Sequence, residues 1–277
     1  MKNINKDKIK MIVTDLDNTY LNKNVMSEYG ESIIKKLIEK GYLVVFATGR
    51  NKRLANNALN DENIYYVVMN GAAIYKGNNP IDKSSVFKKE QLNYLINCLD
   101  QYNTYVNFVS DFSNICCLDK EFYMETIFAH NVLKFSEEEA RAMIPTKFEK
   151  DVNTIKEDIY KVEVSFNNYN SYLKACKELS NIKEINVYGN DKDYIEINKS
   201  DTSKAHGCVK LCNKLNINLD EVIVFGDSKN DLEILNLFPY SICVCDANEE
   251  VKKVCYDICD TSKNDGVAHY LENLFLK

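Results

Sequence analysis

The stretch MIVTDLDNTYLN, residues 11–22, joins two features that decide which fold and which chemistry to expect of this chain. Its first part, residues 11–14, is mainly apolar, which is typical of a buried strand. The strand runs directly into Asp15 and Asp17, two acids that are separated by one residue. Burying carboxylates together is unfavourable unless a cation or hydrogen-bond donors compensate their charge. The question is therefore what else in the sequence reaches the same place.

Apolar and helical segments alternate at both ends of the chain. Near the N-terminus, the apolar segments 42–50 and 64–72 are separated by helical patterns over 27–41 and 51–63. Unbroken apolar strands separated by helices indicate a parallel sheet that is covered on both faces. The alternation returns after residue 200, in a list of helical and apolar segments: 202–215, 221–227, 230–237, 240–246, 248–255 and 256–260. We therefore predict an α/β, doubly wound core.

The middle of the chain follows a different pattern. Between the two core segments, the apolar stretches 104–112, 160–168 and 184–191 are amphipathic or solitary, and helical patterns lie between them. This pattern favours an inserted α+β domain. We expect residues 1–82 and 194–277 to form the core and residues 83–193 to form the insertion.

Composition excludes several classes of function. The formal net charge of −6 argues against a nucleic-acid partner, because phosphate backbones are held mainly by Lys and Arg. No stretch approaches the roughly 20 apolar residues of a membrane span, and the charged start MKNINKDKIK does not resemble a secretory signal. We expect a cytoplasmic protein without a membrane partner. The ten cysteines include no C-x-x-C pair and accompany only three histidines, so we expect reduced thiols. His130 is expected to be a surface or hydrogen-bonded histidine.

Polar residues cluster at the ends of the predicted parallel strands. Ligands of open parallel sheets bind beyond the carboxyl ends of the strands, so these residues should share one site. The acids would repel one another unless a hard divalent ion, most plausibly Mg²⁺, lies between them and shares its open positions with a phosphate. The residues at these ends are Asp15, Asp17, Thr48, Gly49, Arg50, Asp227, Ser228, Asn230 and Asp231, and Lys204 begins a helix nearby.

Four motifs in this order resemble those of the haloacid dehalogenase superfamily, closest to its Cof-type, sugar-phosphatase-like branch. DLDNT at 15–19 is similar to the first motif of the family, and ATGR at 47–50 to the second. Lys204 in SDTSKAHG resembles the lysine of the third motif, and GDSKNDLEIL at 226–235 resembles the fourth. NGA at 70–72 and DGV at 265–267 are also similar to signatures of the branch. The insertion after the third strand resembles a type II cap domain.

The resemblance implies a Mg²⁺-dependent phosphatase that hydrolyses small phosphorylated metabolites, such as sugar phosphates, through an aspartyl-phosphate. Asp15 would be the nucleophile, and Asp17 would be the general acid and base. The ion would be held by the Asp15 carboxylate, the Asp17 backbone carbonyl and Asp227. Asp231 would either bind the ion itself or contact the groups that bind it. The phosphate would be bound by Thr48, Gly49, Arg50, Lys204 and Asn230.

Two residues depart from the family pattern, and three readings stay open. Asn18 replaces the usual Gly and Tyr20 a common Leu; we expect the left-handed turn at Asn18 to survive, because Asn tolerates that conformation. Arg50 could equally form a salt bridge at the start of a helix. A phosphomutase would return the phosphoryl group to a sugar, and a non-catalytic module would only bind phosphate and metal. Asp17 argues against such a module, because phosphate binding needs no second acid.

Overall fold

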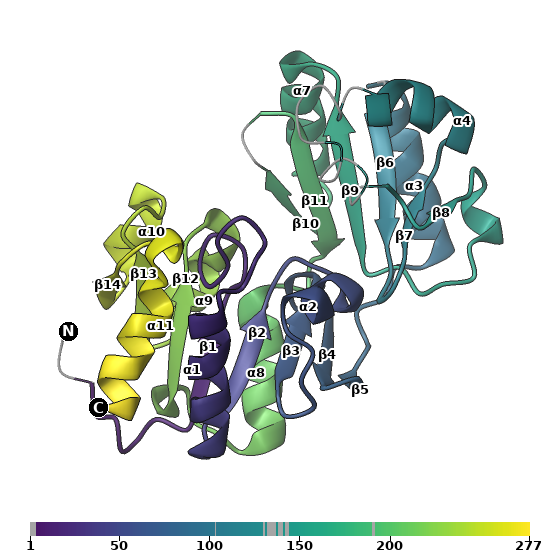
Figure 1. Cartoon of the computed structure of the whole chain (residues 1–277). Coiled ribbons are helices and arrows are strands. Elements are labelled where there is room, and N and C mark those ends of the chain that lie inside the picture. Colours follow the sequence, from purple (N-terminus) through teal and green to yellow (C-terminus); the bar gives the residue numbers. More distant parts are fainter. Residues whose placement is uncertain are drawn as a thin grey trace. The chain divides into compact units, whose positions relative to one another are not determined.

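The computed structural model describes residues 4–102, 104–129, 131, 137, 141, 144–189 and 192–277, so that His130 lies outside the described residues (Figure 1). The chain folds into two compact units. The larger unit comprises Met1–Ser84 and Asp201–Lys277, and the smaller unit comprises Ser85–Ser200. All ten cysteines are free thiols.

The larger unit is built on an eight-stranded sheet in the order β14-β13-β12-β1-β2-β3-β4-β5. The six strands from β14 to β3 are parallel, and β4 and β5 are antiparallel to their neighbours. Every residue of β1, β3 and β12 is buried, which requires cover on both faces of the sheet. The strands are β1 (Met11–Thr14), β2 (Leu43–Ala47), β3 (Tyr65–Val68), β4 (Ala73–Lys76), β5 (Asn79–Asp82), β12 (Val222–Gly226), β13 (Tyr240–Val244) and β14 (Asp257–Cys259).

Three helices of the larger unit, α1, α2 and α8, begin directly after capping residues. The side chains of Ser27, Asn51 and Ser203 each accept a hydrogen bond from a backbone N–H of the first turn. The predicted doubly wound pattern is confirmed, although β4 and β5 were not predicted. The helices are α1 (Glu28–Glu39), α2 (Lys52–Ala58), α8 (Lys204–Leu215), α9 (Leu232–Leu237), α10 (Glu249–Val254) and α11 (Gly266–Leu271).

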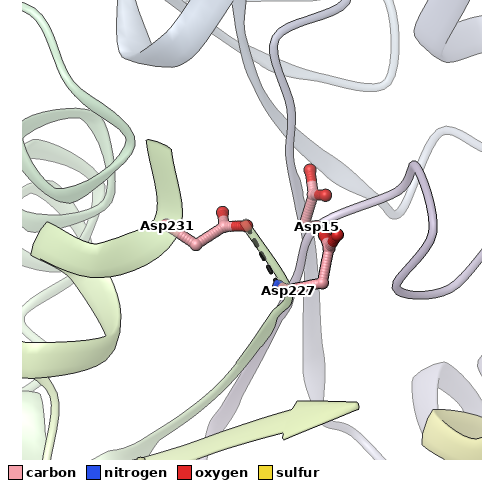
Figure 2. Close-up of side chains that lie close together, drawn as sticks. All are labelled: Asp15, Asp227 and Asp231. Atoms are coloured by element: carbon pink, nitrogen blue, oxygen red, sulfur yellow. Dashed lines mark hydrogen bonds between the residues drawn. The ribbon is translucent and has the colours of Figure 1, made fainter. Parts of the chain in front are cut away.

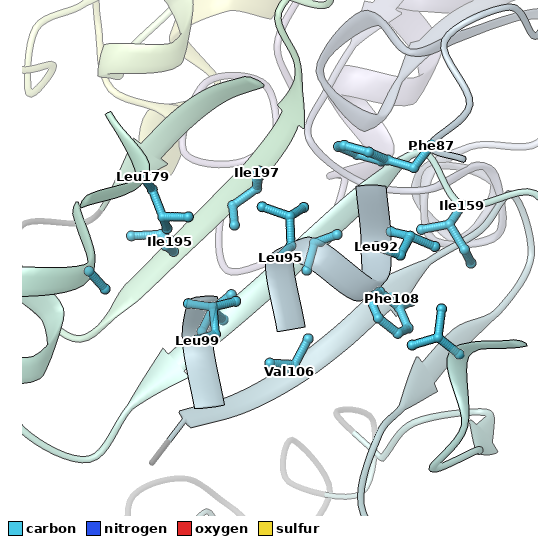
Figure 3. Packing of buried hydrophobic residues seen from close by; sticks show 14 of the residues in the cluster. Phe87, Leu92, Leu95, Leu99, Val106, Phe108, Ile159, Leu179, Ile195 and Ile197 are labelled. Carbon is cyan, nitrogen blue, oxygen red and sulfur yellow. The ribbon is translucent and has the colours of Figure 1, made fainter. Parts of the chain in front are cut away.

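The smaller unit is built on a six-stranded, mainly antiparallel sheet in the order β10-β11-β9-β6-β7-β8. Helices α3 (Lys89–Asp100) and α7 (Tyr169–Leu179) contribute Leu95, Leu99 and Leu179 to a hydrophobic cluster with the strands (Figure 3). The strands are β6 (Thr104–Val109), β7 (Asn114–Cys116), β8 (Lys147–Phe148), β9 (Lys161–Phe166), β10 (Ile185–Gly189) and β11 (Tyr194–Lys199). β11, which was not predicted, pairs with β9 and β10 and therefore lies in this unit.

A glycine contact brings the start of α8 close to the end of β3. Gly71 has φ +97°, and a Cβ atom there would lie 2.0 Å from the backbone oxygen of Ser203, the residue that caps α8. Gly207 in α8 lies at the same contact, because a Cβ atom added there would lie 2.8 Å from the Cα atom of Gly71. The absence of side chains on both residues thus allows the helix that begins at Lys204 to approach the strand ends.

We predict that Gly71→Ala lowers the free energy of unfolding by about 3–5 kcal/mol, because the strain of alanine in a left-handed conformation and the clash of its Cβ atom with Ser203 both destabilise the folded state. Gly41→Ala is the matched control: Gly41 also has a positive φ, +90°, but nothing lies within 4 Å of its Cβ position. Its effect should be about 1–2 kcal/mol. Urea unfolding of the three proteins measures both values. Equal losses in the two variants would contradict the close contact at Gly71.

Candidate functional site

Three side chains of the predicted site follow the carboxyl ends of neighbouring parallel strands. Asp15 comes directly after β1, and its backbone N–H donates to the carbonyl of Phe225 in β12 at 2.9 Å. Thr48 comes directly after β2 and is wholly buried, and Asp227 comes directly after β12. Because β12, β1 and β2 lie side by side, the ladder itself brings these residues to one edge of the sheet.

The chain turns sharply after Asp15 and does not stay extended through Asp17. The carbonyl of Leu16 accepts hydrogen bonds from the backbone N–H groups of Tyr20 at 3.0 Å and Leu21 at 2.7 Å. Asn18 lies in the left-handed region with φ 59°, which confirms the expected turn. In this turn, the Thr19 hydroxyl donates to Asp227 Oδ1 at 2.9 Å. The turn after the first strand thus orients Asp227, an acid of the fourth motif, through the hydroxyl group of Thr19.

Lys204 joins two acids from different parts of the chain. Its Nζ atom donates to Asp15 Oδ1 at 2.7 Å and to Asp231 Oδ1 at 2.8 Å. The side chains of Lys204, Asp15 and Asp231 are only 2%, 6% and 1% exposed, respectively. Charged hydrogen bonds in such a water-poor environment are short and strong, and they leave few orientations open to any of the three groups.

Asp231 also shapes the loop that carries Asp227. Its Oδ2 atom accepts from the backbone N–H groups of Asp227 and Ser228, both at 3.1 Å. A Cβ atom on Gly226 would lie 2.8 Å from the Asp231 side chain, so glycine is needed at the end of β12 for this approach. Both carboxylate oxygens of Asp231 therefore serve to position Lys204 and the loop.

The side chains of Asp15, Asp227 and Asp231 lie close together (Figure 2). Each offers an oxygen atom, and these atoms all lie within 4.8 Å of one another. When all are ionised, three carboxylates and one ammonium group leave two formal negative charges, which suits a divalent cation. Clustered carboxylate oxygens are also the ligands that hard divalent ions prefer. The residues present therefore fit a site for such an ion.

The protonation of the site reflects its burial. Burial raises the pKa of Asp15 well above its ordinary value; Lys204 opposes this effect, and Asp231 and Asp227 reinforce it. Burial, with repulsion from Asp231, raises the pKa of Asp227 to about 6. Burial lowers the pKa of Lys204, but Asp15 and Asp231 outweigh it and raise the pKa above its ordinary value. Lys204 therefore stays protonated, and its single positive charge offsets only one of the three carboxylates when all of them are ionised.

Asp17 lies apart from this carboxylate cluster and is bound by Arg50. Arg50 Nε donates to Asp17 Oδ2 at 2.8 Å, Nη2 donates to Asp17 Oδ1, and Nη2 also donates to Asn24 Oδ1 at 2.7 Å. The backbone N–H of Arg50 donates to Thr48 Oγ1 at 3.1 Å, and Gly49 lies between these two residues. Arg50 therefore forms a salt bridge with Asp17, the second acid of the first motif.

The structure adds two residues, Thr19 and Asn70, that sequence reasoning did not assign to the site, and it shows a partner of Ser228, which the sequence places at the same strand end. Thr19 contacts Asp227, as described above, and Ser228 Oγ donates to Asn230 Oδ1 at 2.7 Å. Asn70, buried and left-handed with φ 58°, accepts from Asn230 Nδ2 at 3.4 Å. The NGA stretch, with Asn before Gly, was the available signal for this tight turn at a strand end.

Together, these features define a doubly wound α/β protein with a lysine-bridged carboxylate site at the carboxyl ends of its parallel strands. The profile of the haloacid dehalogenase-like hydrolases matches residues 12–271. The chain belongs to this family. The predicted family, fold class and hydrolase class are therefore confirmed.

Relatives and solved structures agree with this assignment over nearly the whole chain. A protein of Buchnera aphidicola subsp. Schizaphis graminum is 28% identical over 284 residues, covering 97% of this chain and 96% of its own. The 5-amino-6-(5-phospho-D-ribitylamino)uracil phosphatase YcsE of Bacillus subtilis is 24% identical, with coverages of 97% and 96%. The structure of a haloacid dehalogenase-like hydrolase from B. subtilis superposes with a TM-score of 0.83 at 20% identity, covering 96% of this chain and 100% of its own.

In the part of the chain that the structure describes, no helix has the length and apolar character needed to cross a membrane.

The raised pKa of Asp227 gives a stability prediction. Without a divalent ion, the wild-type protein should lose stability relative to Asp227→Asn as pH rises from 3.8 to about 6. In this window the folded state keeps a proton that the unfolded chain releases. Near neutral pH, Mg²⁺ should then raise the melting temperature of the wild type more than that of Asp227→Asn, because the ion binds the folded state. Thermal unfolding with chelator and with Mg²⁺ measures both effects. Equal Mg²⁺ shifts in the two proteins would remove Asp227 from the ion site.

Proposed function

We propose that this protein is a Mg²⁺-dependent phosphatase that hydrolyses small phosphorylated metabolites through a phosphorylated Asp15. The observation that carries the proposal is the buried arrangement of Asp15, Lys204 and Asp231 beside Asp227 at the strand ends. Membership in a hydrolase family, together with a relative that is itself named a phosphatase, supports the same reaction class.

The proposed reaction has two displacements at phosphorus. In the first, an Asp15 carboxylate oxygen bonds to phosphorus while the bond from phosphorus to the ester oxygen breaks, and Asp17 gives a proton to the departing alkoxide. In the second, water attacks the same phosphorus, Asp17 takes its proton, and the bond between phosphorus and Asp15 breaks. The products are an alcohol and inorganic phosphate, and Asp15 is restored.

Fixed donors would stabilise the transferring phosphoryl group. The ammonium group of Lys204 is held beside Asp15 and can offset charge on a phosphoryl oxygen. Thr48, which follows the neighbouring strand, carries a hydroxyl group. Asn230 is held by hydrogen bonds with Ser228 and Asn70. Because these groups are already oriented by the fold, little reorganisation is required when the charge develops.

The salt bridge between Asp17 and Arg50 suggests how phosphate and acid are linked. Both oxygens of Asp17 are bound by the guanidinium group, so the acid cannot donate a proton in this arrangement. Guanidinium groups bind phosphate as readily as carboxylate. A substrate phosphate that accepts hydrogen bonds from the Arg50 guanidinium group would therefore weaken its salt bridge with Asp17 and free Asp17 for proton transfer.

Asp15 and Asp227 would hold Mg²⁺ through their carboxylates, together with the backbone carbonyl of Asp17. Asp231 would hold Lys204 and the loop in position and would not bind the ion directly, because its oxygens already accept hydrogen bonds from Lys204 and from two backbone N–H groups. When bound, the ion neutralises the carboxylates and polarises a phosphoryl oxygen. We further propose that the inserted segment, residues 83–193, serves as a cap that excludes water from the phosphorylated intermediate.

We predict that Asp15→Asn lowers the rate of phosphate release from p-nitrophenyl phosphate by a factor on the order of 10⁴ or more, since the amide cannot act as a nucleophile. Phosphate release in the presence of Mg²⁺ measures the effect, and chelation of the ion should abolish wild-type turnover. Asp220→Asn, at an exposed carboxylate that pairs with Lys8, is the control and should keep full activity. Wild-type turnover in Asp15→Asn would disprove the covalent route.

A further inference from the structure

Two cysteine side chains form a hydrogen-bonded pair near one edge of the larger unit's sheet. Cys243 lies in β13, and Cys255 directly follows α10, the helix that connects β13 to β14 (Figure 1). The Cys255 thiol donates a hydrogen bond to the Cys243 sulfur. Cys243 is wholly buried, whereas Cys255 is half-buried. The pair is therefore covered by the fold, but one of its two thiols is partly accessible to solvent.

The surroundings of Cys243 favour its thiolate form. The hydrogen bond from Cys255 lowers the pKa of Cys243; burial opposes this effect, and the charge of Lys252 in the last turn of α10 adds to it. The Lys252 ammonium group also contacts Glu249 at 2.8 Å, and it interacts with both Cys243 and the exposed Cys245. Thiols that accept a hydrogen bond beside a cation are reactive, whereas buried thiols in apolar surroundings are inert.

The register of the sheet separates Cys243 from the thiol of the next strand. Cys259 in β14 pairs with Val244, the residue after Cys243. Since successive side chains of a strand point to opposite faces, the Cys259 and Cys243 side chains lie on opposite faces of the sheet. Cys245 lies beyond the end of β13, and its thiol contacts a carboxylate oxygen at 3.8 Å. Cys255 is therefore the thiol that is placed to react with Cys243.

We propose that Cys243 and Cys255 are a redox-active pair that hydrogen peroxide converts to a reversible disulfide. In the first step, the Cys243 thiolate attacks a peroxide oxygen and the O–O bond breaks. Cys243 becomes a sulfenic acid, and the departing hydroxide takes up the proton that the thiol released. In the second step, the Cys255 sulfur attacks the Cys243 sulfur, the S–O bond breaks, and a second water leaves with the Cys255 proton. The two thiols together lose two electrons, which the peroxide gains.

The pair lies next to the strand end that carries the carboxylate site. Cys243 pairs with Gly226, the residue before Asp227. At the start of α10, the backbone N–H of Asn248 donates to the carbonyl of Asp227 at 3.1 Å. A disulfide would thus join β13 to the end of the helix that contacts the Asp227 loop. The inference itself does not depend on the proposed phosphatase function, because it concerns only the two thiols and peroxide.

Treatment of the reduced full chain with an equimolar amount of hydrogen peroxide, followed by mass spectrometry, tests the pair. The protein should lose two hydrogen atoms and two of its ten alkylatable thiols, and dithiothreitol should restore both. Trypsin cleaves after Lys252 and Lys253, so the new bond should link the peptide of Cys243 to the peptide of Cys255. A protein that keeps all of its thiols, or that forms its disulfide between other cysteines, would overturn the proposal.

Four single variants assign the bond, because each of the two linked peptides carries a second cysteine. Cys243→Ser and Cys255→Ser should each abolish the linked peptides, whereas Cys245→Ser and Cys259→Ser should retain them. Circular dichroism melting curves establish that each variant is folded. Fragment spectra of the linked wild-type peptides identify the bonded sulfur atoms without any variant. Linked peptides in a folded Cys243→Ser protein, or wild-type fragments that place the bond on Cys245 or Cys259, would contradict the proposal.

A second thiol pair within the chain is the matched control. Cys208 and Cys212 lie one turn apart in α8, and both are buried. Burial raises the pKa of both thiols, that of Cys212 to about 11. They should therefore stay reduced at the peroxide concentration that oxidises Cys243 and Cys255. Equal oxidation of the two pairs would show that burial and contact alone decide the reaction, and it would overturn the proposal.

A lysine variant tests the assigned role of the cation. Lys252→Gln should slow the loss of thiols about threefold or more, because less of Cys243 is then in the thiolate form. Lys253→Gln, at the neighbouring exposed lysine, is the control and should react at the wild-type rate. The rate of disulfide formation, followed by alkylation at timed intervals, measures both effects. An equal rate in the two variants would contradict activation of the pair by Lys252.

Discussion

The buried ammonium group of Lys204 is the interaction on which the rest of the site depends. It joins Asp15, which follows the first strand, to Asp231, which begins the helix after β12, through hydrogen bonds of 2.7 and 2.8 Å. Without it, two almost fully buried carboxylates would face each other without compensation. The position of Lys204 depends in turn on the contact between Gly71 and Ser203, which brings the start of α8 to the edge of the sheet. This backbone contact therefore helps to place the ammonium group that compensates the charge of the acids.

The lysine compensates only part of the charge at this edge. The third carboxylate, Asp227, is oriented by the Thr19 hydroxyl, and burial, with repulsion from Asp231, raises its pKa to about 6. A site that was built for stability alone would pair every buried acid or replace it. The remaining negative charge is better explained as a place for a divalent ion.

Much of this arrangement could be predicted because it follows from topology. Asp15, Thr48 and Asp227 come after apolar segments that had to be neighbouring parallel strands, and Lys204 starts a helix that the pattern made clear. The salt bridge between Asp17 and Arg50 could not be predicted in the same way. It depends on a turn at Leu16, where one carbonyl accepts several hydrogen bonds, and no strand periodicity encodes that turn.

The elements that the sequence did not reveal share a physical cause. β4 and β5 form an antiparallel hairpin at the edge of the sheet, where the alternation with helices has ended. β11 alternates Ile195 and Ile197 with Glu196, a polar residue that the smaller unit buries in part. That pattern is weak in isolation, because Ile195 and Ile197 are the only residues of this strand that belong to the hydrophobic cluster. For this reason the smaller unit extends to Ser200, whereas the sequence suggested residue 193.

The most direct test of the account is the location of a metal ion and a phosphoryl mimic at the strand ends. Crystals grown with Mn²⁺ and beryllium fluoride would reveal the ion by its anomalous scattering. We predict a Mn²⁺ ion, marked by an anomalous peak, that is bound by carboxylate oxygens of Asp15 and Asp227, with the fluoride complex attached to Asp15 and within hydrogen-bond distance of Lys204. An ion bound elsewhere, with the Asp15 oxygens still free of beryllium, would contradict it.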